Sequence, residues 1–185
     1  MEKISLKDLL KLSKDDLQGK IICFPTDTVY GVGALYNDEV AIKKIYAMKK
    51  RDVGKPLVNL CSSIDQITDL GIVIDAQAQS LMNKHWPGAL TIVLCHQEKT
   101  IAFRMPDSPI ARALVDRFSL LATTSVNESK QAELNSLREI ENQFFNDIDY
   151  LVTDAMSFSQ IPSTVVKVCA GKISVLRQGQ IDVFK

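Results

Sequence analysis

Residues 21–28 read IICFPTDT: four apolar residues run into a proline and then a polar turn. A short apolar run bounded by turn residues is typical of a buried strand, so we expect a strand over 21–24. A helix is expected before it, with Ser5 as its N-cap and Gly19 at its end. The apolar positions of this helix are Leu6, Leu9, Leu10 and Leu17.

The rest of the chain alternates between strand and helix patterns. Strands are expected over 56–61, 90–95, 101–104, 120–124, 150–153, 164–168 and 173–176. Helices are expected from Asn37 or Asp38 to Lys49-Lys50-Arg51, and over 63–70, 75–84, 109–118 and 136–145. Ser108 is the expected N-cap of the helix at 109–118, and Ser136-x-x-Glu139 is a capping box.

This alternation predicts an α/β (α+β) fold, an open twisted mixed sheet with helices on its faces. The late strands are expected to pair antiparallel, because the gaps between them are too short for helical crossovers.

The composition is that of an ordinary folded domain. The 185 residues carry 22 Lys and Arg against 22 Asp and Glu, and 46% are hydrophobic. The length predicts a single domain over 1–185. No apolar run approaches the roughly 18 residues that a membrane span needs. The N-terminal MEKISLKDLLKLSKDD lacks the apolar stretch of a signal peptide, so we expect a cytoplasmic protein without membrane contact.

The four cysteines are expected to be free. They lie tens of residues apart in apolar, strand-like runs, without a C-x-x-C pair, at Cys23, Cys61, Cys95 and Cys169. A free cysteine in such a run behaves as a small hydrophobe. Neither a zinc site nor a disulfide is therefore expected. No acidic pair indicates a metal site either.

Standard nucleotide-binding and hydrolase motifs are absent. Gly31-x-Gly33 follows a strand, but Tyr36 occupies the position of the third glycine in a dinucleotide fingerprint. Gly54-Lys55 lacks the upstream glycine of a P-loop, and no G-x-S-x-G elbow supplies a serine nucleophile.

Hydroxyl-rich segments follow two of the expected strands, where open α/β sheets bind ligands. They are residues 25–31, PTDTVYG, and residues 123–127, TTSVN. Each can hydrogen-bond a small polar ligand, and each can equally be a turn, since these residue types are common in turns.

Cations gather in two further places. Lys49, Lys50, Arg51 and Lys55 fall within seven residues. They suit a polyphosphate and equally suit a solvated helix end. Arg104 and Arg177 each close an apolar strand. A buried arginine needs a partner, which is either a structural carboxylate or an anionic ligand.

Together, these segments resemble the YrdC-like family, the threonylcarbamoyl-AMP synthases. They occur in the family's order and span residues 21–179. The matching segments are FPTDTVYGVG (24–33), MKKR (48–51), KPL (55–57), WPGALT (86–91), AFRMP (102–106), TSVN (124–127), STVV (163–166) and LRQG (176–179).

The resemblance implies a nucleotidyltransferase that joins L-threonine, bicarbonate and ATP into threonylcarbamoyl-adenylate and pyrophosphate. Other proteins then transfer the threonylcarbamoyl group to tRNA. ATP is expected as its Mg²⁺ complex, with the ion carried by the phosphates, and no metal site or tightly bound cofactor is expected. The alternative is a double-stranded RNA- or tRNA-binding module without nucleotidyl transfer.

The resemblance also implies residue roles. The catalytic tetrad is Lys49, Arg51, Ser125 and Asn127, and ATP is bound by these residues with Lys55 and Arg177. Threonine is bound by Thr26, Tyr30, Arg104, Thr123 and Ser163, with Arg104 on its carboxylate. The chain departs from the family's pattern at Asn59, Val126, Lys130 and Gln178, where His, Ala, Gly and Pro are usual.

Overall fold

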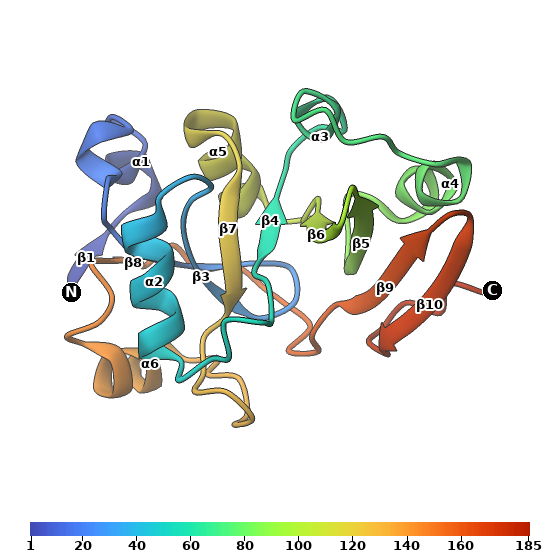
Figure 1. Ribbon diagram of the computed structural model, residues 1–185. Coiled ribbons are helices and arrows are strands. Elements are labelled where there is room, and N and C mark those ends of the chain that lie inside the picture. The colour runs from blue at the N-terminus through green and yellow to red at the C-terminus, as the bar shows by residue number, and fades with distance from the viewer.

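The computed structural model describes residues 1–185 and contains one ten-stranded mixed sheet (Figure 1). The strands are β1 (Glu2–Ile4), β2 (Ile22–Pro25), β3 (Tyr30–Leu35), β4 (Val58–Leu60), β5 (Leu90–His96), β6 (Lys99–Arg104), β7 (Leu121–Ser125), β8 (Tyr150–Val152), β9 (Thr164–Cys169) and β10 (Lys172–Arg177). The helices are α1 (Leu6–Leu9), α2 (Glu39–Met48), α3 (Asp65–Thr68), α4 (Ala76–His85), α5 (Pro109–Phe118) and α6 (Leu137–Phe144), with a 3-10 turn at Asp15–Leu17.

The sheet order is β1-β8-β2-β3-β7-β4-β6-β5-β9-β10. The N-terminus lies at one end of this sheet, and the β9–β10 hairpin lies at the other end, beside the C-terminus (Figure 1). The prediction of an open mixed sheet with helices on its faces is confirmed. None of the helices is long and apolar enough to cross a lipid bilayer.

The first half of the sheet is covered by helices on both faces. In β2, Phe24 packs in one core cluster with Leu114 of α5. Cys23, the next residue back, faces the other way and belongs to a cluster with Ile45 of α2 and Phe144 of α6. Successive side chains of a strand point to opposite faces. The continuous apolar run at 21–24 therefore serves two cores at once.

Beyond β4, the sheet is covered by helices on one face only. Ile92 of β5, Phe103 of β6 and Val166 of β9 pack in one cluster with Leu81 and Met82 of α4. The residues that alternate with them point to the opposite face, where no helix covers them. This bare face carries the site described below.

Most predicted elements and caps are confirmed. The helix expected over 109–118 coincides with α5, and Ser108 Oγ accepts a hydrogen bond from the Ala111 amide at 3.1 Å. Ser136 Oγ likewise accepts from the Glu139 amide at 3.2 Å and begins α6. Asp38 caps α2 by accepting from the Ala41 amide at 2.9 Å.

The prediction of one long N-terminal helix between Ser5 and Gly19 was wrong. The chain instead forms the four-residue α1 and a separate 3-10 turn. Ser13 Oγ accepts from the Asp16 amide at 3.2 Å, while the Ser13 amide donates to Asp16 Oδ2 at 2.8 Å. These bonds begin a new turn and compete with continuation of the first helix.

Strand β3 was not predicted, because Gly31 and Gly33 give its sequence, YGVGAL, a weak strand signal. It forms a hairpin with β2 and pairs antiparallel with β7. Gly33 lies opposite Thr123 in that pair, and a Cβ at position 33 would come within 2.5 Å of Thr123 Cγ2. Only glycine allows this close approach of the two strands.

Antiparallel pairing of the late strands is confirmed only for β9 with β10. Strand β8 instead pairs parallel with β1 and β2, and β9 pairs parallel with β5 at the far end of the sheet. The connection from β8 to β9 thus crosses the molecule rather than forming a tight turn.

The prediction that the chain has no disulfide was also wrong. Cys95 and Cys169 form a disulfide, with their Cα atoms 5.3 Å apart. Because β5 and β9 pair in parallel with Leu94 opposite Val168, the next residue of each strand comes side by side. Cys23 and Cys61 are free and buried, as predicted.

Candidate functional site

A cavity of about 670 Å³ lies over this bare face and extends onto β4 and β7. Its floor consists of residue pairs two positions apart on neighbouring strands, which therefore point to the same face. These pairs are Val58 and Leu60, Thr91 and Val93, Ala102 and Arg104, Thr123 and Ser125, and Ser163 and Val165. Its walls are the 26–31 segment, the 51–56 loop, and the hairpin residues Leu176 and Arg177. No helical residue lines it.

The lining is cationic and rich in hydroxyl groups. Its charged side chains are Arg51, Lys55, Arg104 and Arg177, and it contains no Asp, Glu or His. Seven serine and threonine hydroxyls accompany them, at Thr26, Thr28, Thr91, Thr123, Thr124, Ser125 and Ser163. A cavity with four cations and no carboxylate is suited to an anionic ligand with several charges.

Arg104 is fixed in the floor of the cavity by three hydrogen bonds. Its Nε donates to the Gly88 carbonyl at 3.0 Å, Nη1 donates to Thr28 Oγ1 at 2.8 Å, and Nη2 donates to Asp27 Oδ1 at 2.6 Å. The side chain is only 7% exposed, and burial lowers its pKa while the Asp27 carboxylate acts in the opposite direction. One N–H on each terminal nitrogen is left for a ligand.

Arg177, on the hairpin wall of the cavity, is connected to two hydroxyls of the floor. Both Nε and Nη2 of Arg177 donate to the Ser163 carbonyl, at 3.1 and 2.9 Å, and Nη2 also reaches Ser163 Oγ at 3.2 Å. Ser163 Oγ lies 2.8 Å from Thr91 Oγ1. The Arg177 guanidinium of β10, Ser163 just before β9 and Thr91 of β5 therefore form one connected polar row.

The 51–56 loop presents the other two cations. Arg51 donates from Nε to the Lys55 carbonyl at 3.0 Å and from Nη2 to the Pro56 carbonyl at 3.1 Å. Tyr46 Oη of α2 donates to the same Lys55 carbonyl at 3.0 Å. These bonds close the loop on itself and hold Arg51 at the cavity wall.

Lys49 lies beneath the cavity rather than in its lining. Its Nζ donates to the Ser125 carbonyl at 2.5 Å, the Asn127 carbonyl at 2.7 Å and Asn127 Oδ1 at 2.7 Å. All three N–H bonds are thus directed at the 125–127 loop. Burial lowers the Lys49 pKa to about 8, and the Arg51 charge acts in the same direction.

Asn127 completes this arrangement from the loop side. Its Oδ1 also accepts from Ser125 Oγ at 2.8 Å, and its Nδ2 donates to the Gln131 carbonyl at 2.7 Å. Lys49 and Asn127 therefore hold Ser125 at the edge of the cavity, and neither contacts the cavity itself.

Nine of the eleven residues predicted for the site line this one cavity. They are Thr26, Tyr30, Arg51, Lys55, Arg104, Thr123, Ser125, Ser163 and Arg177. The other two, Lys49 and Asn127, lie behind it. Thr28 and Thr124 also line the cavity; they lie in the two predicted hydroxyl-rich segments but were given no role of their own. Thr91 lines it as well and lies outside those segments. Thr91 is the single hydroxyl residue in the otherwise apolar start of β5, and that isolated polar position was the signal that could have revealed it.

The departures from the family pattern lie outside the cavity lining. Asn59 points away from it, and its Nδ2 donates to the Ala102 carbonyl at 3.2 Å. Gln178 Nε2 donates to the Ile181 carbonyl at 2.8 Å in the C-terminal segment. Lys130 has φ of 72°, in the left-handed region that favours glycine, which accounts for the usual glycine at this position.

No group of three or more His, Cys, Asp or Glu side chains is arranged to hold a metal ion. Any divalent ion in this cavity would therefore depend on its ligand for most of its coordination, as Mg²⁺ commonly does with nucleotides.

Comparisons with known proteins identify the family of this chain. The Sua5/YciO/YrdC family model, described as "Telomere recombination", matches residues 17–179. The threonylcarbamoyl-AMP synthase of Bacillus subtilis is 34% identical over 171 residues, which are 86% of this chain and 49% of that protein. That of Pseudoalteromonas translucida is 31% identical and covers 84% of this chain and 90% of its own.

A solved structure, P. abyssi Sua5 complexed with L-threonine, superposes with a TM-score of 0.86 at 28% identity. It covers 97% of this chain and 58% of the other, so the chain spans about half to three fifths of its longer relatives. The predicted family resemblance is confirmed. The chain belongs to the Sua5/YciO/YrdC family.

Proposed function

We propose that this chain, as one domain over residues 1–185, is a threonylcarbamoyl-AMP synthase. It would condense L-threonine, bicarbonate and ATP into threonylcarbamoyl-adenylate and pyrophosphate. The observation that carries the proposal is the cavity lining, with four cations, seven serine and threonine hydroxyls and no carboxylate. The names of the relatives support the same reaction.

The reaction brings two anions together. The neutral threonine amine first attacks the carbon of bicarbonate, a C–O bond breaks and water leaves, which gives an N-carboxylate. One oxygen of this N-carboxylate then attacks the α-phosphorus of ATP. The bond between the α-phosphorus and the oxygen that bridges it to the β-phosphorus breaks, and pyrophosphate leaves with the electron pair. No side-chain nucleophile takes part. The protein's task is to screen both anions and to align them, which fixed cations in a partly dry cavity do well.

The threonine would lie at the floor of the cavity. The two unused N–H bonds of Arg104 suit its carboxylate, and the Asp27 and Thr28 contacts keep the guanidinium in place. The amino group would meet hydroxyls such as Ser163 and Thr123 and no carboxylate. Four nearby cations disfavour its protonated form, and the neutral amine is the form that can be carboxylated.

The triphosphate would lie between the two remaining cationic walls. Arg51 and Lys55 come from one loop and Arg177 from the hairpin opposite, so they can contact phosphates from two sides. Mg²⁺ would enter on the phosphates of ATP. Lys49 and Asn127 would act through the 125–127 loop, by holding Ser125 toward the nucleotide.

The product is a mixed anhydride that water hydrolyses, so proteins that transfer the threonylcarbamoyl group to tRNA should receive it promptly. We place this pathway in the cytoplasm. The alternative of an RNA-binding module is not favoured, because four cations line a cavity and the chain as a whole has a net charge of zero.

The test is pyrophosphate release from ATP-Mg²⁺, with and without L-threonine and bicarbonate. Release should require both small substrates. Arg104→Gln should raise the KM for threonine about 10-fold or more while leaving the KM for ATP nearly unchanged, since it removes one charged contact. Arg117→Gln, on the exposed end of α5, is the matched control and should change neither. An unchanged threonine KM in Arg104→Gln would contradict the assignment, and no release with all substrates would contradict the function.

A further inference from the structure

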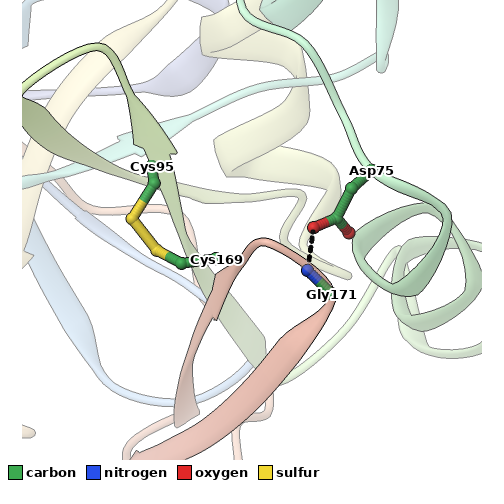
Figure 2. Close-up of a disulfide and its surroundings, with 4 residues drawn as sticks. All are labelled: Asp75, Cys95, Cys169 and Gly171. Carbon is green, nitrogen blue, oxygen red and sulfur yellow. Dashed lines mark hydrogen bonds between the residues drawn. A yellow bond between two sulfur atoms is a disulfide. The ribbon is translucent and has the colours of Figure 1, made fainter.

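The Cys95–Cys169 disulfide lies outside the cavity, at the C-terminal ends of β5 and β9 (Figure 2). Cys95 is exposed and Cys169 is half-buried. Cys23 and Cys61 differ from them in being fully buried, with burial raising the pKa of both thiols. Cys95 and Cys169 are therefore the only cysteines whose sulfur atoms small thiols can reach.

The disulfide anchors the hairpin that forms one wall of the cavity. Strand β10 pairs only with β9, and β9 joins the rest of the sheet only through β5. The hairpin and the residue before it supply Ser163, Val165, Leu176 and Arg177 to the lining. The attachment of β9 to β5 thus determines where this cationic wall stands relative to Arg104.

Two links hold the turn end of the hairpin. One is the disulfide, and the other is the hydrogen bond that the Gly171 amide donates to Asp75 Oδ2 at 3.1 Å (Figure 2). Asp75 is also the N-cap of α4, where its other oxygen accepts from the Ala78 amide at 2.8 Å. The turn residues Ala170 and Gly171 both have positive φ, which suits a tight two-residue hairpin.

The middle of the hairpin has a different anchor. Val166 and Val168 are buried in the core against α4, and they do not depend on the disulfide. Cys169 lies four residues beyond Val165, or about 13 Å along the strand. Breaking the disulfide would therefore loosen the turn end without detaching the hairpin, and a graded change at the cavity is expected rather than its loss.

We propose that Cys95 and Cys169 form a thiol–disulfide exchange site whose oxidised state clamps the β9–β10 hairpin to β5 and tightens the cavity for its anionic ligand. The part of this proposal that concerns ATP rests on the proposed function. The reactants are low-molecular-weight thiols and their disulfides.

The exchange consists of two substitutions at sulfur, each of which forms one S–S bond and breaks another. A small thiolate attacks the exposed Cys95 Sγ, the bond between the two protein sulfurs breaks, and the electron pair leaves on Cys169 Sγ, which takes a proton from water. A second small thiolate attacks the outer sulfur of the mixed disulfide and releases Cys95 as a thiolate. The two small thiols are oxidised to one disulfide, and the protein gains two thiols. The reverse sequence restores the clamp.

The test compares four samples: oxidised and reduced wild type, and the Cys95→Ser/Cys169→Ser double variant under both conditions. The double variant retains Cys23 and Cys61, so it is the matched control for any other effect of the reagents. Alkylation under denaturing conditions counts the free thiols. Amide hydrogen exchange follows 164–177, and pyrophosphate release gives the KM for ATP.

We expect two free thiols in the oxidised wild type and four in the reduced form. Exchange over 164–177 should be faster in the reduced wild type and in the double variant, and the KM for ATP should rise about fivefold. The double variant should not respond to the reagents. Equal rates of amide hydrogen exchange over 164–177 in the oxidised and reduced wild type would overturn the proposed clamp. So would a double variant whose hydrogen exchange or KM for ATP still changes with the redox reagents. Absence of pyrophosphate release in both redox states would overturn the synthase function, while a difference in exchange would still support the clamp.

Discussion

Replacing Lys49 by methionine should separate the folding stability of this protein from its activity. The Lys49 ammonium is buried and directs all three N–H bonds at the 125–127 loop. Methionine is similar in length and removes only the charge and the donors. If Lys49 acts by positioning this loop, the variant should fold well and react poorly.

The change in stability is a small difference between two larger effects. The substitution leaves the carbonyls of Ser125 and Asn127 without their donor, at roughly 1–3 kcal/mol each. Asn127 Oδ1 retains the Ser125 hydroxyl as a partner. In the other direction, the substitution removes a buried charge. A Lys49 pKa of about 8 against the ordinary 10.5 corresponds to about 3 kcal/mol. The net loss of unfolding free energy should be about 1 kcal/mol.

The change in activity should be much larger. A displacement of about 1 Å in a positioning element can lower the rate about 100-fold, and we expect a fall of that order in kcat/KM for ATP. Urea denaturation and pyrophosphate release measure the two effects on the same protein. Lys50→Met is the matched control. Lys50, the next residue after Lys49, is 72% exposed and pairs with Glu128, and such surface pairs contribute about 0–1 kcal/mol.

A double-mutant cycle with Asn127→Ala tests whether Lys49 acts through the Asn127 side chain. If Lys49 acts through Asn127, the double variant should be no slower than the slower single variant. Independent, additive losses would show that Lys49 does not act through the Asn127 side chain, since its bonds to the Ser125 and Asn127 carbonyls remain in Asn127→Ala. A Lys49→Met variant with kcat/KM within about threefold of the wild type would refute a positioning role for Lys49.

Three further results are expected. Between pH 8 and 10.5, Lys49 is protonated in the unfolded chain but loses its proton in the folded one. From pH 8 to 9, the free energy of unfolding of the wild type should therefore rise by about 1 kcal/mol relative to that of Lys49→Met, as measured by denaturant titration. A constant difference between the two proteins would contradict the lowered pKa. Reduction of the Cys95–Cys169 disulfide, which joins residues 74 apart, should lower the unfolding free energy by as much as about 4 kcal/mol in the chain-entropy model, and a loss below about 0.5 kcal/mol would count against the bond. Lys130→Gly should raise the melting temperature, because the left-handed backbone at this position costs a residue with a Cβ about 1 kcal/mol. A lower melting temperature would show that contacts of the Lys130 side chain stabilise the loop by more than this cost.

The parts of the fold that were predictable from the sequence are those specified by local chemistry. The apolar runs, the caps at Ser108 and Ser136, and the order of the elements follow from periodicity and hydrogen bonding within a few residues. The pairing of strands is different in kind. Strand β1 pairs with β8, whose residues lie almost 150 positions later, and nothing in its three residues specifies that partner.

The same distinction accounts for the site. Nine of the eleven predicted residues line the cavity because family motifs mark strand ends, and strand ends meet at one place in an open sheet. Motif membership does not indicate which way a side chain points. Lys49 follows a helix whose stripe of Ala41, Ile45 and Met48 is buried, and its own side chain continues inward beneath the loop. The disulfide was missed for a similar reason, because it depends on the parallel register of two distant strands.

The location of the cavity follows from how apolar residues are distributed between the two faces of the sheet. Strand β2 is apolar at every position, so both its faces need cover, and helices provide it. In β5 and β6, Ile92 and Phe103 face the core, whereas Thr91 and Arg104 face the other side. A helix packed over that second face would bury hydroxyls and a guanidinium without enough partners, which is costly. Thr91 and Arg104, which share this face with the apolar Val93 and Ala102, therefore account for its being uncovered, and they supply polar groups that a charged substrate needs.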